Sequence, residues 1–156
     1  MSLQNKLRGT GVALITPFTS NGDIDFDALH KVINHVIDGD VEYVITLGTT
    51  GETPTLDKFE KIDLIKISYK IVDNRVPVVV GVGGNNTKEL LYDLETFPLD
   101  NAAAILSASP YYSKPSQEGL YQHYKTLAHA SPKPVLLYNV PGRTGRNVNA
   151  STTIRL

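Results

Sequence analysis

The fold is decided by the stretch Tyr43-Val44-Ile45-Thr46-Leu47-Gly48-Thr49-Thr50-Gly51-Glu52. Its first five residues are mostly β-branched or aromatic and do not alternate with polar side chains, which is typical of a strand covered on both faces. Two glycines and two threonines follow, so the strand ends in a tight turn beside two hydroxyl groups. The stretch therefore predicts a buried strand of a parallel sheet. An ordinary strand-to-helix turn explains the loop Gly48–Glu52 as well as a ligand site does.

Four further apolar runs have the same character. They are Val12-Ala13-Leu14-Ile15, Val78-Val79-Val80, Ala103-Ala104-Ile105-Leu106 and Val135-Leu136-Leu137-Tyr138. Helical patterns lie between the runs, and the residues that can cap these helices are Asp25, Asp57, Thr87, Ser116 and Asn149. The second helix carries a stripe of apolar residues, namely Phe59, Ile62, Ile65, Tyr69 and Val72. Strands thus alternate with helices in units of roughly 30 residues, the size of a βαβ unit.

Two architectures fit this alternation: a doubly wound open sheet and a (β/α)8 TIM barrel. Both place functional residues at the carboxyl ends of the strands. A barrel usually needs ~250 residues, whereas this chain has 156 residues and about five strands. The sequence contains no linker or shift in composition. We therefore expect residues 1–156 to form one incomplete barrel domain, made of about the first five βα units and truncated before the sixth strand.

Composition limits the classes of partner. The net charge is −1 and there are no cysteines. A nucleic-acid or anionic-membrane partner usually requires a basic face, so we expect neither. The four histidines show no metal-ligand spacing, and we expect no metal site. No apolar run is long enough to span a bilayer, and the first residues contain no signal core, which predicts a cytoplasmic protein.

The strand-end segment Tyr138-Asn139-Val140-Pro141-Gly142-Arg143-Thr144-Gly145 combines two chemical groups. Tyr138 ends an apolar run, and Arg143 lies in the loop that the proline and glycines predict. A phenol can pass a proton, and a guanidinium can hold a carboxylate with paired donors. We expect the two side chains to converge on one opening at the carboxyl end of this strand.

Two other loops follow predicted strands. Gly81–Thr87 suggests a dinucleotide-binding turn in an open sheet, but Asn86 occupies the third glycine position and the loop follows the third strand instead of the first. A close-approach turn explains it better. In the later loop, Tyr111 and Tyr112 are consecutive, so they cannot both be core residues of one strand. At least one is expected at the surface or an interface, and loop packing explains Tyr111 as well as a functional role does.

Together these segments resemble the dihydrodipicolinate synthase (4-hydroxy-tetrahydrodipicolinate synthase) family of class I aldolase-type (β/α)8 barrels. The resemblance covers nearly the whole chain. It is carried by Gly9-Thr10-Gly11-Val12-Ala13-Leu14-Ile15-Thr16-Pro17-Phe18, Gly48-Thr49-Thr50-Gly51-Glu52, Pro110-Tyr111-Tyr112, Pro115-Ser116-Gln117-Glu118-Gly119-Leu120-Tyr121-Gln122-His123-Tyr124 and Tyr138-Asn139-Val140-Pro141-Gly142-Arg143-Thr144-Gly145.

The resemblance implies a lyase that condenses pyruvate with L-aspartate 4-semialdehyde through a Schiff base, without a cofactor, in lysine and diaminopimelate biosynthesis. Tyr138 would shuttle protons, Thr49 would relay them to Tyr112, and Thr50 would bind the pyruvate carboxylate. Arg143 would hold the carboxylate of aspartate semialdehyde. Tyr112 would serve the site of a neighbouring subunit, in a homodimer or homotetramer of the complete protein.

The sequence departs from the family in two respects. The family's Schiff-base lysine lies at the end of the sixth strand, and this sequence is expected to stop before that strand. We therefore do not expect residues 1–156 to form the imine. Asn85, Glu89 and Tyr111 match the effector site of lysine-inhibited members, but Lys61 stands where those members carry histidine or glutamate. A fixed cation there would repel the effector's amino groups, which predicts weak or absent lysine inhibition.

Two alternatives stay open. N-acetylneuraminate lyase and the keto-deoxy sugar-acid aldolases share the glycine-threonine segment, although they usually lack the arginine that stands here as Arg143. The chain could also be an inactive, truncated scaffold, since half a barrel exposes sheet edges and apolar faces.

Overall fold

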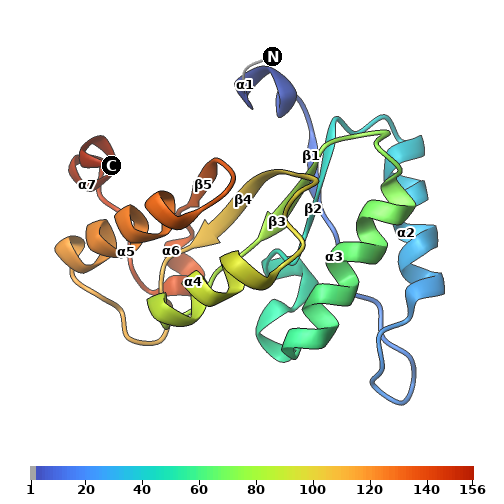
Figure 1. Ribbon diagram of the computed structural model, residues 1–156, viewed down its shortest axis with the longest axis horizontal. Helices are drawn as coiled ribbons and strands as arrows, with labels where there is room; N and C mark the ends of the chain where they lie inside the picture. The colour runs from blue at the N-terminus through green and yellow to red at the C-terminus, as the bar shows by residue number, and fades with distance from the viewer. Residues whose placement is uncertain (1–2) are drawn as a thin grey trace. The chain divides into compact units, whose positions relative to one another are not determined.

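The computed structural model describes residues 3–156 and confirms the alternation of strands and helices (Figure 1). The elements are α1 (Leu3–Lys6), β1 (Gly11–Ala13), α2 (Phe26–Asp38), β2 (Tyr43–Thr46), the 3-10 turns η1 (Thr49–Gly51) and η2 (Thr53–Thr55), α3 (Lys58–Val72), β3 (Val78–Gly81), α4 (Thr87–Thr96), β4 (Ala102–Ala108), α5 (Gln117–Ala130), β5 (Val135–Tyr138), α6 (Pro141–Thr144) and α7 (Ala150–Arg155).

The strands follow one another in the sheet in chain order, β1-β2-β3-β4-β5. The pairs β1–β2, β2–β3 and β4–β5 are parallel. A doubly wound sheet reverses its strand order at a topological switch point, and this sheet has no reversal. The sequential order therefore supports the barrel-type prediction over the doubly wound one.

The chain divides into two compact units. The first unit runs to Gly81 and includes Phe97–Ala104. In it, α2 and α3 pack side by side (Figure 1). Its buried side chains include Leu29, Ile33, Val44, Leu64, Ile65, Val79 and Val80. Full burial of each aliphatic side chain contributes roughly 1.5–3 kcal/mol to folding.

The predicted stripe on α3 is wrong at one position. The side chain of Phe59 is 78% exposed, whereas Leu64, Ile65, Ser68 and Val72 are buried. Phe59 lies five residues before Leu64, which places it about 140° around the helix from that residue. The buried face includes a serine and leaves the phenylalanine in solvent.

The second unit comprises Val82–Thr96 and Ile105–Leu156. Its helix α5 packs against α4 and α7. Leu120, Tyr124 and Val148 form a buried cluster, and Leu137 of β5 packs against it. Every residue of β5 is half-buried, in contrast to the fully buried β3 of the first unit.

The predicted helix caps are confirmed for three helices. Asp25 caps α2, Asp57 and Glu60 form a capping box on α3, and Ser116 caps α5. The prediction for Thr87 is wrong, because Thr87 is the first residue inside α4. Asn86 lies before it and accepts the Lys88 N–H at Oδ1, 3.1 Å away.

Candidate active site

Tyr138 and Arg143 lie on consecutive elements of the second unit. Tyr138 is the half-buried last residue of β5, and Arg143 is exposed on α6. The prediction of an irregular loop is wrong at this point, because the segment forms one helical turn. Pro141 starts that turn with a φ suited to a helix, and Gly145 ends it at φ 63°. The turn fixes the backbone from which the guanidinium extends.

Asn139 holds the strand end that carries Tyr138. Its Oδ1 accepts the Val148 N–H at 3.0 Å, and its Nδ2 donates to Asn147 Oδ1 at 2.8 Å. These bonds hold the segment that follows α6 against the end of β5. An asparagine side chain commonly replaces backbone partners in this way where a strand gives way to a turn.

Gln117, at the start of α5, contacts the same returning segment. Its Nε2 donates to the Asn147 carbonyl at 2.8 Å. Its Oε1 accepts from the Asn149 N–H at 3.1 Å and from the Thr152 hydroxyl at 2.6 Å. Local sequence patterns indicated no role for Asn139 or Gln117. Both stand inside the motifs that carry the family resemblance, but their partners are not adjacent to them in sequence.

Tyr111 and Tyr112 share one hydrogen-bond acceptor, Asn85. Both backbone N–H groups donate to Asn85 Oδ1 at 2.8 Å. The side chain of Tyr111 is 39% exposed and that of Tyr112 is 86% exposed. The expectation that at least one of these tyrosines lies at the surface is confirmed. Glu89 is exposed in the first turn of α4.

Thr49 and Thr50 follow β2 in the first unit, and both are exposed on η1. Two threonine hydroxyls brace this turn. Thr16 Oγ1 donates to the Gly51 carbonyl at 2.7 Å, and Thr53 Oγ1 donates to the Gly48 carbonyl at 3.0 Å. The structure thus holds two candidate residues at the carboxyl end of β2, and the others lie in the second unit.

Polar contacts of two consecutive α5 residues, His123 and Tyr124, support the elements of the second unit. His123 Nδ1 lies 2.8 Å from Thr87 Oγ1, so α5 contacts the start of α4. Burial lowers the pKa of His123. The adjacent Tyr124 donates from its hydroxyl to the Ser107 carbonyl, and its hydroxyl also lies 3.1 Å from Ser109 Oγ. Burial raises the pKa of Tyr124, and both rings therefore favour the neutral state.

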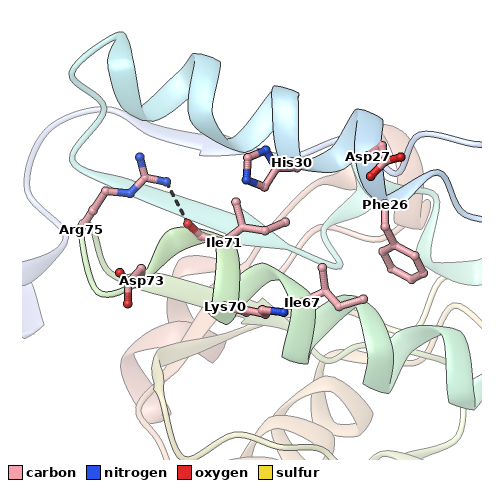
Figure 2. A pocket seen from close by; sticks show the side chains of 8 residues that line it. All are labelled: Phe26, Asp27, His30, Ile67, Lys70, Ile71, Asp73 and Arg75. Carbon is pink, nitrogen blue, oxygen red and sulfur yellow. Dashed lines mark hydrogen bonds between the residues drawn. The ribbon is translucent and has the colours of Figure 1, made fainter.

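A separate pocket of about 460 Å³ lies on the first unit between α2 and α3 (Figure 2). It is lined by Phe26, Asp27, His30, Ile67, Lys70, Ile71, Asp73 and Arg75. The guanidinium of Arg75 already has hydrogen-bond partners within the unit, because it donates to the carbonyls of Ile71 and Val72 and to Asn34 of α2. The pocket belongs to the helical layer, and none of the predicted site residues lines it.

Among the helices of residues 3–156, none is both long and apolar enough to cross a membrane.

Residues 6–156 match the model of the dihydrodipicolinate synthetase family. The 4-hydroxy-tetrahydrodipicolinate synthase of Karelsulcia muelleri is 51% identical over 150 residues, which cover 96% of this chain and 51% of that protein. The synthase of Parabacteroides distasonis is 49% identical, with 96% of this chain and 50% of that protein covered. The chain thus spans about half the length of the curated relatives it matches.

Solved structures agree with this assignment. A chloride-inhibited dihydrodipicolinate synthase from Acinetobacter baumannii, solved with pyruvate, superposes with a TM-score of 0.92 at 39% identity, over 96% of this chain and 52% of that one. The synthase from Thermotoga maritima gives a TM-score of 0.90 at 41% identity, over 96% and 50% of the two chains. The chain therefore belongs to the dihydrodipicolinate synthetase family, and its strands and helices are the first five βα units of a (β/α)8 barrel.

Proposed function

We propose that the complete protein condenses pyruvate with L-aspartate 4-semialdehyde, as a lyase of lysine and diaminopimelate biosynthesis. The family match and the names of the relatives support this reaction. One structural observation carries it to particular residues: Tyr138 ends β5, and the one-turn helix α6 directly after it presents Arg143. A phenol and a guanidinium on adjacent rigid elements suit a reaction that moves protons and holds a carboxylate.

The reaction begins when a lysine amine adds to the keto group of pyruvate and water leaves, which gives an iminium ion. The family resemblance implies that this lysine follows on a sixth strand, and β5 is the last strand within residues 3–156. Loss of a methyl proton gives the enamine, whose carbon then attacks the aldehyde. Each step transfers a proton, and phenols and hydroxyls can do so without placing a fixed charge beside the iminium.

In this scheme Tyr138 exchanges protons with the intermediate, and Thr49 relays them to Tyr112. Thr50 binds the pyruvate carboxylate. The braced turn η1 supports these two threonine roles, because it holds both exposed hydroxyls at the end of β2. Arg143 binds the carboxylate of the aldehyde substrate with paired donors.

We further propose that the complete protein forms a homodimer or homotetramer in which Tyr112 enters the site of a neighbour. The support is its exposure: Tyr112 is 86% exposed, so packing of its side chain contributes almost nothing to the stability of its own unit. Tyrosine is enriched at protein interfaces, where it combines apolar area with a polar hydroxyl. One incomplete barrel domain and a cytoplasmic location complete the proposal. Both rest on the family and on the sequence.

The test is turnover of the complete protein with pyruvate and aspartate semialdehyde, together with borohydride trapping of pyruvate. Arg143→Ala should lower kcat/KM for the aldehyde about 100-fold, because a bidentate charged contact contributes roughly 3 kcal/mol. Pyruvate trapping should persist in this variant. Arg155→Ala is the control, since Arg155 is an exposed arginine of α7 that pairs with Glu118.

Cleavage of N-acetylneuraminate or of a keto-deoxy sugar acid, without condensation, would refute the proposed reaction and favour the aldolase alternative. Residues 1–156 alone should not trap pyruvate. Trapping by this segment would show that the amine nucleophile is one of its own lysines.

A further inference from the structure

Asn85 links two loops that are far apart in the sequence. It lies between β3 and α4, and its Oδ1 accepts the N–H groups of Tyr111 and Tyr112, which stand 26 and 27 residues later in the chain. An amide oxygen has two lone pairs. Both are therefore used by these donors, and only the Nδ2 donors of Asn85 remain for other partners.

The segment around Asn85 is itself firmly held. Before it, the Val82 N–H donates to the Leu106 carbonyl at 2.9 Å. After it, Asn86 caps the first turn of α4, and Thr87 contacts His123. His123 is only 5% exposed, so its side of this partly buried contact is well covered. Asn85 is thus anchored on both sides before it reaches the tyrosine loop.

The tyrosine loop has few contacts of its own. Residues 111–114 are all exposed, and Lys114 has a positive φ of 48°. Ser109 and Pro110, directly before them, are buried. Burial therefore holds the start of the loop. Beyond that point the position of the Tyr112 backbone depends on hydrogen bonds.

We propose that Asn85 is a positioning residue for Tyr112. Two bonds to consecutive N–H groups fix both the place and the direction of the peptide that carries the phenol. The assignment rests on the proposed function, in which the Tyr112 hydroxyl completes a proton relay. Asn85 acts only as an acceptor in this role, and it touches no reacting atom.

Three variants of the complete protein test this assignment. Asn85→Ala removes the acceptor and should lower kcat about tenfold, since small displacements of catalytic groups are costly. The KM for pyruvate should stay within about twofold, because the residues that bind carboxylates are unchanged. Asn85→Asp keeps an oxygen acceptor and should restore kcat. Lys88→Ala is the control, since Lys88 is an exposed residue in the first turn of α4, three residues after Asn85.

A second measurement follows the bonds directly. Amide hydrogen exchange at Tyr111 and Tyr112 should accelerate at least tenfold in Asn85→Ala and return to the wild-type rate in Asn85→Asp. Wild-type kcat in Asn85→Ala would overturn the assignment, even if exchange accelerates. An equal loss of kcat in Asn85→Asp would also overturn it, because the amide donors would then matter.

The two proposals can fail separately. A wild-type protein that does not condense the two substrates refutes the proposed function, and with it the catalytic part of the assignment. An active wild-type enzyme that is indifferent to Asn85→Ala refutes only the positioning role. Circular dichroism and thermal unfolding of Asn85→Ala show whether a loss of kcat comes from unfolding. A loss of kcat with unchanged unfolding supports positioning, and a loss that tracks unfolding overturns it.

Discussion

Arg146 donates a hydrogen bond from Nε to the carbonyl oxygen of Lys114 at 2.9 Å. This bond joins the segment after α6 to the loop that carries Tyr112. The two segments also approach closely at Gly145, where an added Cβ would lie 2.9 Å from Lys114 Cε. The elements that present Arg143 and Tyr112 are therefore connected within the second unit.

Arg146→Ala should weaken this connection. The lost bond contributes about 0.5–1.5 kcal/mol, and the exposed position places the effect on stability at the lower end. We expect kcat of the complete protein to fall by a few-fold. The loss of kcat in the double variant with Asn85→Ala should be smaller than the sum of the two single losses, because both side chains restrain one short loop. A double-mutant cycle on kcat measures this coupling, and strictly additive losses would show that the two anchors act independently.

Asn139→Ala should destabilise the second unit. The change leaves the N–H of Val148 without its acceptor in a buried position. Asn139 itself is exposed and the bond is only partly buried, so its loss costs about 0.5–1.5 kcal/mol. Urea unfolding measures the change in the free energy of unfolding. Asn139→Asp keeps the oxygen acceptor and should recover most of the loss, and equal stability of the alanine variant and wild type would contradict the prediction.

His123 should make stability depend on pH. Burial lowers its pKa in the folded state below the ordinary value of 6.5, and its buried Nε2 has no hydrogen-bond partner within residues 3–156. The unfolded chain therefore binds more protons as pH falls. This contribution to stability is complete above pH 6.5 and is lost below it, by at most about 1.4 kcal/mol per pH unit.

Urea unfolding at pH 7.5 and pH 5.5 tests this dependence, and His123→Gln should reduce the difference between the two. His35→Gln provides the matched control, since His35 is an exposed histidine of α2. If His123→Gln keeps the full difference in stability between pH 7.5 and pH 5.5, other titrating groups cause the pH dependence.

Lysine should inhibit the complete protein weakly or not at all. We infer an effector site from Asn85, Glu89 and Tyr111, and the cation of Lys61 would repel the amino groups of lysine. Asn85 adds a structural reason, because both acceptor positions of its Oδ1 are already filled. Lys61→Glu should increase sensitivity to lysine. Calorimetry would contradict this prediction by showing micromolar binding of lysine to the wild-type protein.

Local patterns predicted the elements well, because each depends on residues close in sequence. The unbroken apolar run Val78–Val80 became the buried strand β3. Asp57 with Glu60 formed the capping box of α3. The cap of α4 was misplaced by one residue, because Asn86 and not Thr87 supplies the acceptor for the first turn. The other error arose where tertiary contacts decided the outcome. Phe59 fitted an apolar stripe, but the buried face of α3 is set by contacts with the rest of its unit.

The sequence predicted the chemical groups of the candidate site, but not the hydrogen bonds that hold its loops in place. Tyr138 and Arg143 were found because a proline and two glycines marked a strand end. The sequence predicted Asn85 only as a residue of the effector site. Its bonds to Tyr111 and Tyr112 join different loops, and no local spacing in the sequence encodes such a contact.

The sequential strand order has a consequence for the way the chain folds. Each of the pairs β1–β2 and β2–β3 joins a strand to the one made just before it, separated by a single helix. Both pairings lie within the first 81 residues, so they need no part of the chain that is made later. The first three strands can thus assemble while the ribosome is still adding later residues, which shortens the time during which their apolar edges are open to aggregation.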